Sequence, residues 1–241
     1  MIIFRKIALL FFDLIDKFIH QKKILSSLLK LKRNINIYVD VGSHFGLYAD
    51  FIDNNFNPKK IFLFEPQNKI FKRIENKYKL LDKFKVNNSA VSDENTIKSL
   101  YINKHDLTSS FTEFNNDNHY LNYKARLFGG SLKQMILNTE KVETVRLDTY
   151  INTEEMNTID LLKIDTEGHE LQVLRGLGKK ISDVGIILIE FHNDNIYLNY
   201  ESAKIHEYLV KSGFELTEKI KFPFTEWEDR IYVNSLKKQK I

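Results

Sequence analysis

The chain has 241 residues, of which 43% are hydrophobic and 28% charged, a composition that excludes disorder and allows one globular domain with its own core. It contains no cysteine, which excludes disulfides, zinc-thiolate sites and cysteine nucleophiles. Eight of the 36 Lys and Arg residues but only two of the 32 acids lie in residues 1–33, so this segment carries +6. The rest, with 28 basic and 30 acidic residues, is close to neutral. Such a body lacks the basic surface that binds nucleic acid, and we expect no nucleic-acid partner.

Residues 1–33 form a basic segment that we expect to be an amphipathic helix, because apolar side chains recur at helical spacing on one face. The apolar run Ile7–Phe12 is interrupted at Asp13, precedes no cleavage site and is too short to span a bilayer. Three interpretations stay open: a helix docked on the domain, which we favour, a homodimer contact, or a peripheral membrane anchor. We expect a cytoplasmic protein, with membrane-peripheral attachment as the alternative.

Short apolar runs alternate with segments of helical periodicity in residues 34–241, which we expect to form the main domain. In chain order, the first half predicts a strand at 35–41, a helix at 47–54, a strand at 60–64, a helix at 68–81 and strands at 84–91 and 98–102. After a polar and aromatic insert near 103–141, we expect strands at 142–147 and 158–164, a helix at 169–180, a strand at 184–191, a helix at 202–212 and strands at 214–220 and 230–233. This alternation indicates a mostly parallel sheet that binds ligands at the carboxyl ends of its strands.

The sequence YVDVGSHFG at residues 38–46 places a turn between the first strand and the first helix of this domain. Gly42 allows a tight turn and a close approach of a ligand to the backbone, while the helix after Gly46 presents free N–H groups to an anion. Asp40 supplies a carboxylate suited to an ammonium group. The D-x-G-x-x-x-G spacing differs from the G-x-G-x-x-G spacing of dinucleotide-binding proteins. An ordinary strand–turn–helix glycine is the alternative.

The second strand is followed by an acid, Glu65. A carboxylate at this position can accept hydrogen bonds from both hydroxyls of a ribose, as it does in NAD-binding proteins. Glu65 therefore predicts a nucleoside ligand without identifying which one.

Ionisable side chains also end the two apolar strands of the second half. Asp165 follows the strand at 158–164, where it can point into a cleft or cap the next helix. Glu190 and His192 lie at the end of the next strand, and His192 is a candidate general base, an ordinary hydrogen-bonded histidine being the alternative. Asp165, Glu190 and His192 also suit a divalent ion, but their spacing does not require one and we expect no metal.

Together these segments resemble the FkbM family of S-adenosylmethionine-dependent methyltransferases. The resemblance runs from Tyr38 to Val233 and rests on YVDVGSHFGLYA, IFLFEPQ, NNSAVSD, HDLTSSF, VRLDTYI and, most distinctively, DLLKIDTEGHELQVLRG. It implies an α/β, Rossmann-like class I methyltransferase fold with a seven-stranded, mostly parallel sheet in the order 3-2-1-4-5-7-6, strand 7 antiparallel, and helices on both faces. It also implies S-adenosyl-L-methionine as the cofactor.

The same resemblance implies roles for individual residues. The first turn would hold the methionine end of the cofactor, Glu65 the ribose and the segment after the third strand the adenine, with Asp165 near the methyl group. The implied cofactor-binding set is Asp40, Gly42, Ser43, His44, Gly46, Glu65, Ser89, Ala90 and Asp165. His169 stands where family members often carry a small residue, and we favour a helix-surface histidine there over a substrate contact.

From these features we expect O-methylation of a sugar or another small hydroxylated acceptor, with His192 as the general base assisted by Asp165 or Glu190. The partner is then a small-molecule or glycan acceptor. Two alternatives belong to other classes. A nicotinamide-dependent oxidoreductase on a related sheet would bind NADH, and a non-catalytic, membrane-peripheral binding protein would lose its liposome association without residues 1–33.

Overall fold

The computed structural model describes residues 19–32, 34–103, 109–115, 117–118, 136–154, 156–193, 196–198, 200–223 and 225–237. Most of the predicted N-terminal helix and most of the predicted insert near 103–141 lie outside these residues. Within them, no helix is long and apolar enough to cross a membrane.

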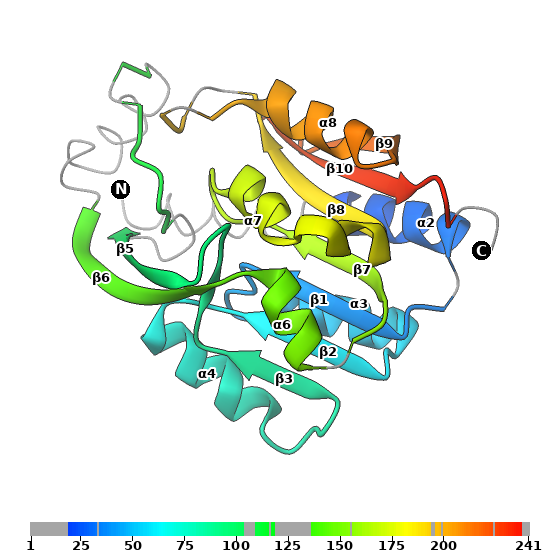
Figure 1. The fold of residues 1–241 in the computed structure, drawn as a ribbon, viewed down its shortest axis with the longest axis horizontal. Helices are drawn as coiled ribbons and strands as arrows, with labels where there is room; N and C mark the ends of the chain where they lie inside the picture. Colours follow the sequence, from blue (N-terminus) through cyan, green and yellow to red (C-terminus); the bar gives the residue numbers. More distant parts are fainter. Residues whose placement is uncertain are drawn as a thin grey trace.

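Seven strands form the main sheet, in the order β3-β2-β1-β7-β8-β10-β9 (Figure 1). Their bounds are β1 Ile37–Val41, β2 Lys60–Phe64, β3 Phe84–Asn87, β7 Ile159–Ile164, β8 Val184–His192, β9 Phe214–Lys221 and β10 Trp227–Asn234. The strands from β3 to β8 pair in parallel, and β10 runs antiparallel to both β8 and β9. Counted within the sheet the order is 3-2-1-4-5-7-6 with strand 7 antiparallel, which confirms the predicted fold.

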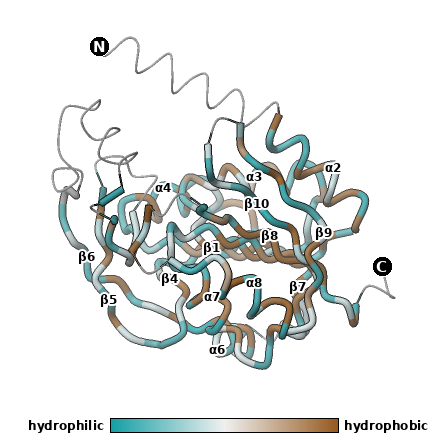
Figure 2. Tube along the Cα trace, turned by 90° about the horizontal axis from the view of Figure 1, so that it is seen from above, coloured by the Kyte–Doolittle hydropathy of each residue, from teal (hydrophilic) through white to brown (hydrophobic). Residues whose placement is uncertain are grey.

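Helices cover both faces of this sheet, because its central strands are apolar on both sides. In β7, the neighbouring Leu161 and Leu162 are fully buried in opposite core clusters, as expected where side chains alternate between faces. One cluster includes side chains of α6 (Leu147–Thr153), α7 (Glu170–Gly176) and α8 (Ser202–Lys211), and the other includes side chains of α2 (Gln21–Leu31), α3 (Leu47–Phe56) and α4 (Asn68–Tyr78). In Figure 2, the hydrophobic central strands lie between these two layers of helices.

A second, three-stranded sheet differs from the sequence expectation. The strand predicted at 84–91 is two strands: β3 joins the main sheet, whereas β4 (Ala90–Val91) pairs with β6 (Ile136–Val145), which also pairs with β5 (Thr96–Asn103). The polar residues between β3 and β4 explain the break, because the Asn87 and Asn88 amides donate to the carbonyls of Leu63 and Glu65 at the end of β2.

The helices also differ from the prediction at two places. Helix α6 begins at Leu147, within the strand predicted at 142–147. The helix predicted at 169–180 ends at Gly176 and is followed by the 3-10 helix η4 (Gly178–Asp183). Gly178 has φ +50°, a left-handed conformation that interrupts a right-handed helix.

Helix α2 is anchored to the sheet by the carboxylate of a buried aspartate in the central strand. Asp160 of β7 accepts a hydrogen bond from Lys32 Nζ at 2.5 Å and two more from the backbone amides of Asn36 and Ile37, at 2.7 and 2.9 Å. Asp160 thereby ties the end of α2 and the start of β1 to the middle of the sheet. Burial opposes ionisation of Asp160, but these hydrogen bonds outweigh it and lower its pKa.

The turn after β1 makes a close backbone contact with the end of β7. Gly42 has φ +83°, and a Cβ at this position would lie 1.8 Å from the carbonyl oxygen of Asp165. The amides of Gly42 and Ser43 both donate to the Phe64 carbonyl at the end of β2, at 3.2 and 3.1 Å. The carboxyl ends of β1, β2 and β7 are therefore held together at Gly42.

We expect Asp160→Asn to lower the free energy of unfolding by about 1–3 kcal/mol at pH 7, because charge-assisted hydrogen bonds to three donors are lost or weakened. The pKa of Asp160 is lower in the folded protein, so its contribution is present above the unfolded pKa and is lost as pH falls through the folded value. Urea unfolding at several pH values should show that the difference in the free energy of unfolding between the wild type and Asp160→Asn becomes smaller below about pH 4. Asp82→Asn, at an exposed aspartate, is the matched control, and equal stability of the two variants would contradict the anchoring role.

We expect Gly42→Ala to destabilise the protein by at least about 2 kcal/mol more than Gly213→Ala, because only the first substitution forces two backbones apart. Gly213 has a similar φ of +86° but no atom within 4 Å of an added Cβ, so it isolates the cost of the left-handed conformation. Urea unfolding of both variants measures the difference. Equal losses would show that no close approach exists at Gly42.

Candidate active site

A cavity of about 360 Å³ lies at the carboxyl ends of β1, β2, β7 and β8. The strand order reverses between β1 and β7, and open α/β sheets bind ligands at such a switch point. Of the residues predicted to bind the cofactor, six line this cavity: Gly42, Ser43, His44, Glu65, Ala90 and Asp165. Asp40, Gly46 and Ser89 lie close by in sequence but not on its wall.

A buried lysine links the two acids predicted at the ends of β1 and β7. Lys163 Nζ lies 2.9 Å from Asp165 Oδ2 and 3.9 Å from Asp40 Oδ1, and it sits 4.5 Å from the centre of the Tyr48 ring. Burial opposes ionisation of Asp165, but the Lys163 charge outweighs it and lowers the pKa of that carboxyl. Asp40 is fully buried beneath the cavity, and burial raises its pKa. No role for Lys163 was predicted from the sequence, although a lysine within the otherwise mostly apolar strand IDLLKI is a signal that could have found it.

Two backbone amides, one after β1 and one after β2, hold the Glu65 carboxylate in place. Its Oε2 accepts a hydrogen bond from the His44 amide at 3.0 Å, and its Oε1 accepts one from the Gln67 amide at 2.9 Å. Glu65 is 3% exposed, so its carboxylate is held in one place against the cavity. Each carboxylate oxygen can accept more than one hydrogen bond.

One end of the cavity is apolar and is built by the second sheet. Ala90, Val91, Leu100 and Phe111 line it together with His169. His169 is 6% exposed, with its Nε2 3.0 Å from Ser92 Oγ, so the expectation of a helix-surface histidine is wrong. Burial lowers the pKa of His169 to about 4, which makes the ring neutral at pH 7.

The opposite end begins at the turn between β7 and α7, which presents Glu167 to the cavity. Glu167 and Gly168 have φ of +54° and +96°, and the buried Glu170 carboxylate fixes this turn by accepting hydrogen bonds from the Thr166 and Gly168 amides, both at 3.1 Å. The Tyr197 hydroxyl donates to Glu167 Oε2. Sequence reasoning placed Glu167 in the turn but assigned it no role.

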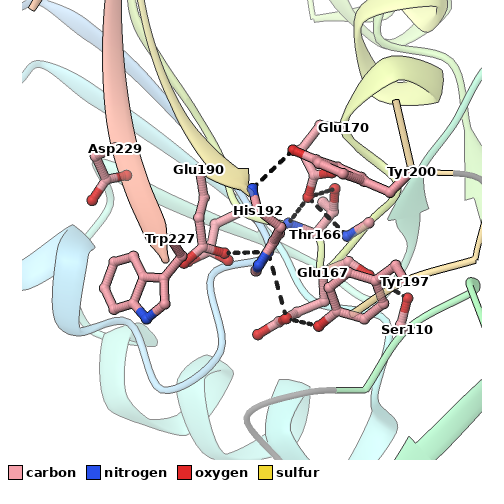
Figure 3. A network of polar contacts seen from close by, with 12 residues as sticks. Ser110, Thr166, Glu167, Glu170, Glu190, His192, Tyr197, Tyr200, Trp227 and Asp229 are labelled. Atoms are coloured by element: carbon pink, nitrogen blue, oxygen red, sulfur yellow. Dashed lines mark hydrogen bonds and ion pairs between the residues drawn. The ribbon is translucent and has the colours of Figure 1, made fainter. Parts of the chain in front are cut away.

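Figure 3 shows Glu167, Glu190 and His192 converging at this end. His192 Nε2 lies 3.1 Å from Glu190 Oε2 and 3.9 Å from Glu167 Oε2. Glu167 and Glu190 line the cavity, whereas His192 lies behind them and is 6% exposed. The predicted neighbours Glu190 and His192 are thus brought together, and Asp165 contacts Lys163 and interacts with Glu190 as well.

The three carboxylates at this end differ in their charge states. Burial raises the pKa of Glu167 to about 8, and repulsion from Glu190 adds to the rise. Burial also raises the pKa of Glu190 well above its ordinary value, followed by repulsion from Asp165. The lowered pKa of Asp165 favours its ionised form, whereas the raised pKa values of Glu167 and Glu190 favour their protonated forms.

Strand β10 supplies residues that the sequence alone did not predict. Its antiparallel register places Trp227 opposite His192 and Asp229 opposite Glu190. Trp227 and Asp229 both line the cavity, and Trp227 stacks on Phe222 with the ring centres 4.4 Å apart. His20, directly before α2, lies 2.7 Å from Asp229 Oδ2 through its Nε2.

Comparison with known proteins identifies the family. The model of the methyltransferase FkbM domain matches residues 40–216, well over half of the chain. A curated relative, the hexuronic acid methyltransferase AglP of Haloferax volcanii, is 31% identical over 51 residues, and this segment covers 21% of either chain.

Two solved structures are similar over most of the chain. An rRNA methylase from Streptococcus thermophilus has a TM-score of 0.49 and 12% identity, with 88% of this chain and 94% of the other covered. Magnesium protoporphyrin IX methyltransferase from Synechocystis PCC 6803 has a TM-score of 0.45 and 11% identity, with 90% and 80% covered. The match of the family model carries the assignment: the chain belongs to the FkbM family of methyltransferases, with S-adenosyl-L-methionine as its cofactor.

Proposed function

We propose that the chain transfers the methyl group of S-adenosyl-L-methionine to a hydroxyl oxygen of a sugar or another small hydroxylated acceptor. The observation that carries this proposal is the end of the cavity lined by Glu167, Glu190, Trp227 and Asp229. Carboxyl groups hydrogen-bond hydroxyls, and an indole ring offers a flat apolar surface to the carbon face of a sugar ring. The name of the curated relative, a hexuronic acid methyltransferase, supports a sugar acceptor.

In the orientation that the strand order favours, the cofactor would lie along this cavity. The backbone of Gly42, Ser43 and His44 would hold the methionine end, and the close packing at Gly42 shows how little space that backbone leaves for a side chain. Glu65 would accept hydrogen bonds from the ribose hydroxyls. Ala90, which lines the apolar end, would contact the adenine together with the neighbouring Ser89. Asp40 would act indirectly, through Lys163 and Asp165.

The opposite end of the cavity would then hold the acceptor. When bound, the cofactor supplies a methyl group on a positively charged sulfur, which the ionised Asp165 attracts. Lys163 is the one Lys or Arg among the described lining residues, and it is engaged by Asp165 and Asp40. Since the described lining offers a carboxylate acceptor no cationic side chain that is not already engaged, we propose a neutral acceptor hydroxyl.

Glu190 and His192 would remove the proton of that hydroxyl. As the acceptor oxygen forms its bond to the methyl carbon, the carbon–sulfur bond breaks and its electron pair stays on sulfur, so the oxygen must lose its proton. Glu190 faces the cavity, and its raised pKa makes its ionised form a stronger base than an exposed glutamate. His192, 3.1 Å behind it, would share the proton. Asp165 would position rather than deprotonate, because its lowered pKa makes it a weak base.

We expect Glu65→Ala to weaken the binding of S-adenosylhomocysteine by about 1–3 kcal/mol, because the ribose hydroxyls lose a charged acceptor. Calorimetric titration of the purified protein measures this change, with Glu75→Ala at an exposed position as the control. NADH serves as the competing ligand. Unchanged affinity in the folded variant would remove Glu65 from the site, and binding of NADH in place of S-adenosylhomocysteine would favour the oxidoreductase alternative.

We expect His192→Ala to lower kcat for methylation of a neutral sugar by about 10²–10⁴-fold and to leave the affinity for S-adenosylhomocysteine unchanged, because His192 acts on the acceptor proton. Formation of S-adenosylhomocysteine in the presence of a panel of neutral sugars and uronic acids provides the assay. Turnover equal to that of the wild type would exclude His192 as the proton acceptor. Methylation of uronic acids alone would contradict the neutral acceptor.

A further inference from the structure

We propose that Glu167, Glu190 and His192 bind a divalent transition-metal cation such as Mn²⁺ at the acceptor end of the cavity. This inference rests on the proposed function, because the ion would hold the acceptor hydroxyl. Each residue offers one ligand atom, and the three atoms lie within 4.8 Å of one another. Two carboxylates and an imidazole form a donor set that such cations accept.

The unsatisfied polar atoms of His192 and Glu190 point independently to a ligand. Among the described residues, neither ring nitrogen of His192 nor Oε2 of Glu190 has a hydrogen-bond partner, although all three atoms are buried. His192 Nε2 and Glu190 Oε2 lie only 3.1 Å apart without forming a hydrogen bond. Buried polar groups are costly when unpaired. Two such atoms at contact distance, both turned toward the same space, are arranged as ligands around an ion.

The electrostatics of the cluster favour a cation at this place. Glu167 and Glu190 both line this end of the cavity, and Lys163, the one Lys or Arg among the described lining residues, is engaged by Asp165 and Asp40. Two carboxyl groups that share a wall without a cation of their own attract a divalent ion, which can bind an oxygen of each.

The surrounding residues hold the three ligands in place. The Tyr197 hydroxyl donates to Glu167, and the Tyr200 hydroxyl accepts a hydrogen bond from the His192 amide at 3.2 Å. The Tyr197 ring also meets the His192 ring edge to face, with the centres 5.0 Å apart. Partners of this kind orient metal ligands. The sequence offered Asp165 together with Glu190 and His192 as a donor set for a divalent ion, but Asp165 contacts Lys163, and Glu167 completes the cluster.

Three protein ligands leave coordination positions open for the oxygen of the acceptor. A hydroxyl bound there would have a lowered pKa and would lose its proton to water before its oxygen attacks the methyl carbon. In the metal-loaded protein, Glu190 and His192 would thus act as ligands, and the ion would replace them in activating the hydroxyl. Without the ion, the slower route through Glu190 and His192 would remain.

The test is electron paramagnetic resonance of Mn²⁺ titrated into the full chain after treatment with EDTA. We expect one bound Mn²⁺ per chain, with the affinity lowered at least about 10-fold in Glu167→Gln and in Glu190→Gln, since even changes to residues around a metal ligand have effects of this size. Glu201→Gln, at an exposed glutamate of matched chemistry, should bind Mn²⁺ as the wild type does. Urea unfolding checks that each variant is folded. If one of the two glutamate variants fails to fold, the other still tests the site. Absence of bound Mn²⁺, or equal binding by all folded variants, would overturn the inference.

Titration with S-adenosylhomocysteine and the sugar assay on the same samples separate this inference from the proposed function. Sugar methylation at the same rate with EDTA and with Mn²⁺, without bound Mn²⁺, would sink the metal site and leave the proposed function standing. Bound Mn²⁺ that the glutamate variants weaken, without methylation of any hydroxylated acceptor, would establish the metal site and overturn the proposed O-methylation.

Discussion

The Lys163 ammonium group, buried between Asp40 and Asp165, is the interaction on which the site depends. A charge inside the sheet must be paired, because the desolvation cost of an isolated ion is larger than packing can offset. Lys163 lies in the middle strand and meets one carboxylate from each side of the point where the strand order reverses. Its charge lowers the pKa of Asp165, and among the described lining residues no other Lys or Arg lies at the cavity.

Much of the fold could be predicted because its signals are local. The central strands of the main sheet are mostly apolar runs, and the helices between them carry one apolar face each, so periodicity alone located most of them. Gly42 and Glu65 were found for the same reason, since both stand directly after an apolar strand. The break between β3 and β4 was missed because FKVNNSAV has the length of one strand, and only the contacts of the Asn87 and Asn88 side chains show that it divides.

The acceptor end could not be predicted in the same way, because it is assembled by pairing between distant strands. Trp227 and Asp229 face the site only because β10 pairs with β8 in the register that sets them against His192 and Glu190. A shift of one residue would turn both side chains to the other face of the sheet. His20 reaches Asp229 across 209 positions of sequence, and no local pattern reports such a contact. The position of Glu167 could not be predicted either, because it depends on a turn with left-handed backbone angles that the Glu170 carboxylate fixes.

The acidity of the cavity constrains both the proposed reaction and the proposed ion. Asp165, Glu167, Glu190 and Asp229 all line the cavity, and burial, followed by repulsion from neighbouring carboxylates, raises the pKa of Glu167 and Glu190. Buried ionisable groups of this kind are costly to keep for structure alone, because well-packed apolar side chains of similar size often give a more stable protein. A cationic cofactor accounts for one negative charge beside Asp165. Neither ring nitrogen of His192 has a hydrogen-bond partner among the described residues, and the divalent ion that we propose would give Nε2 and the two glutamates a shared positive partner.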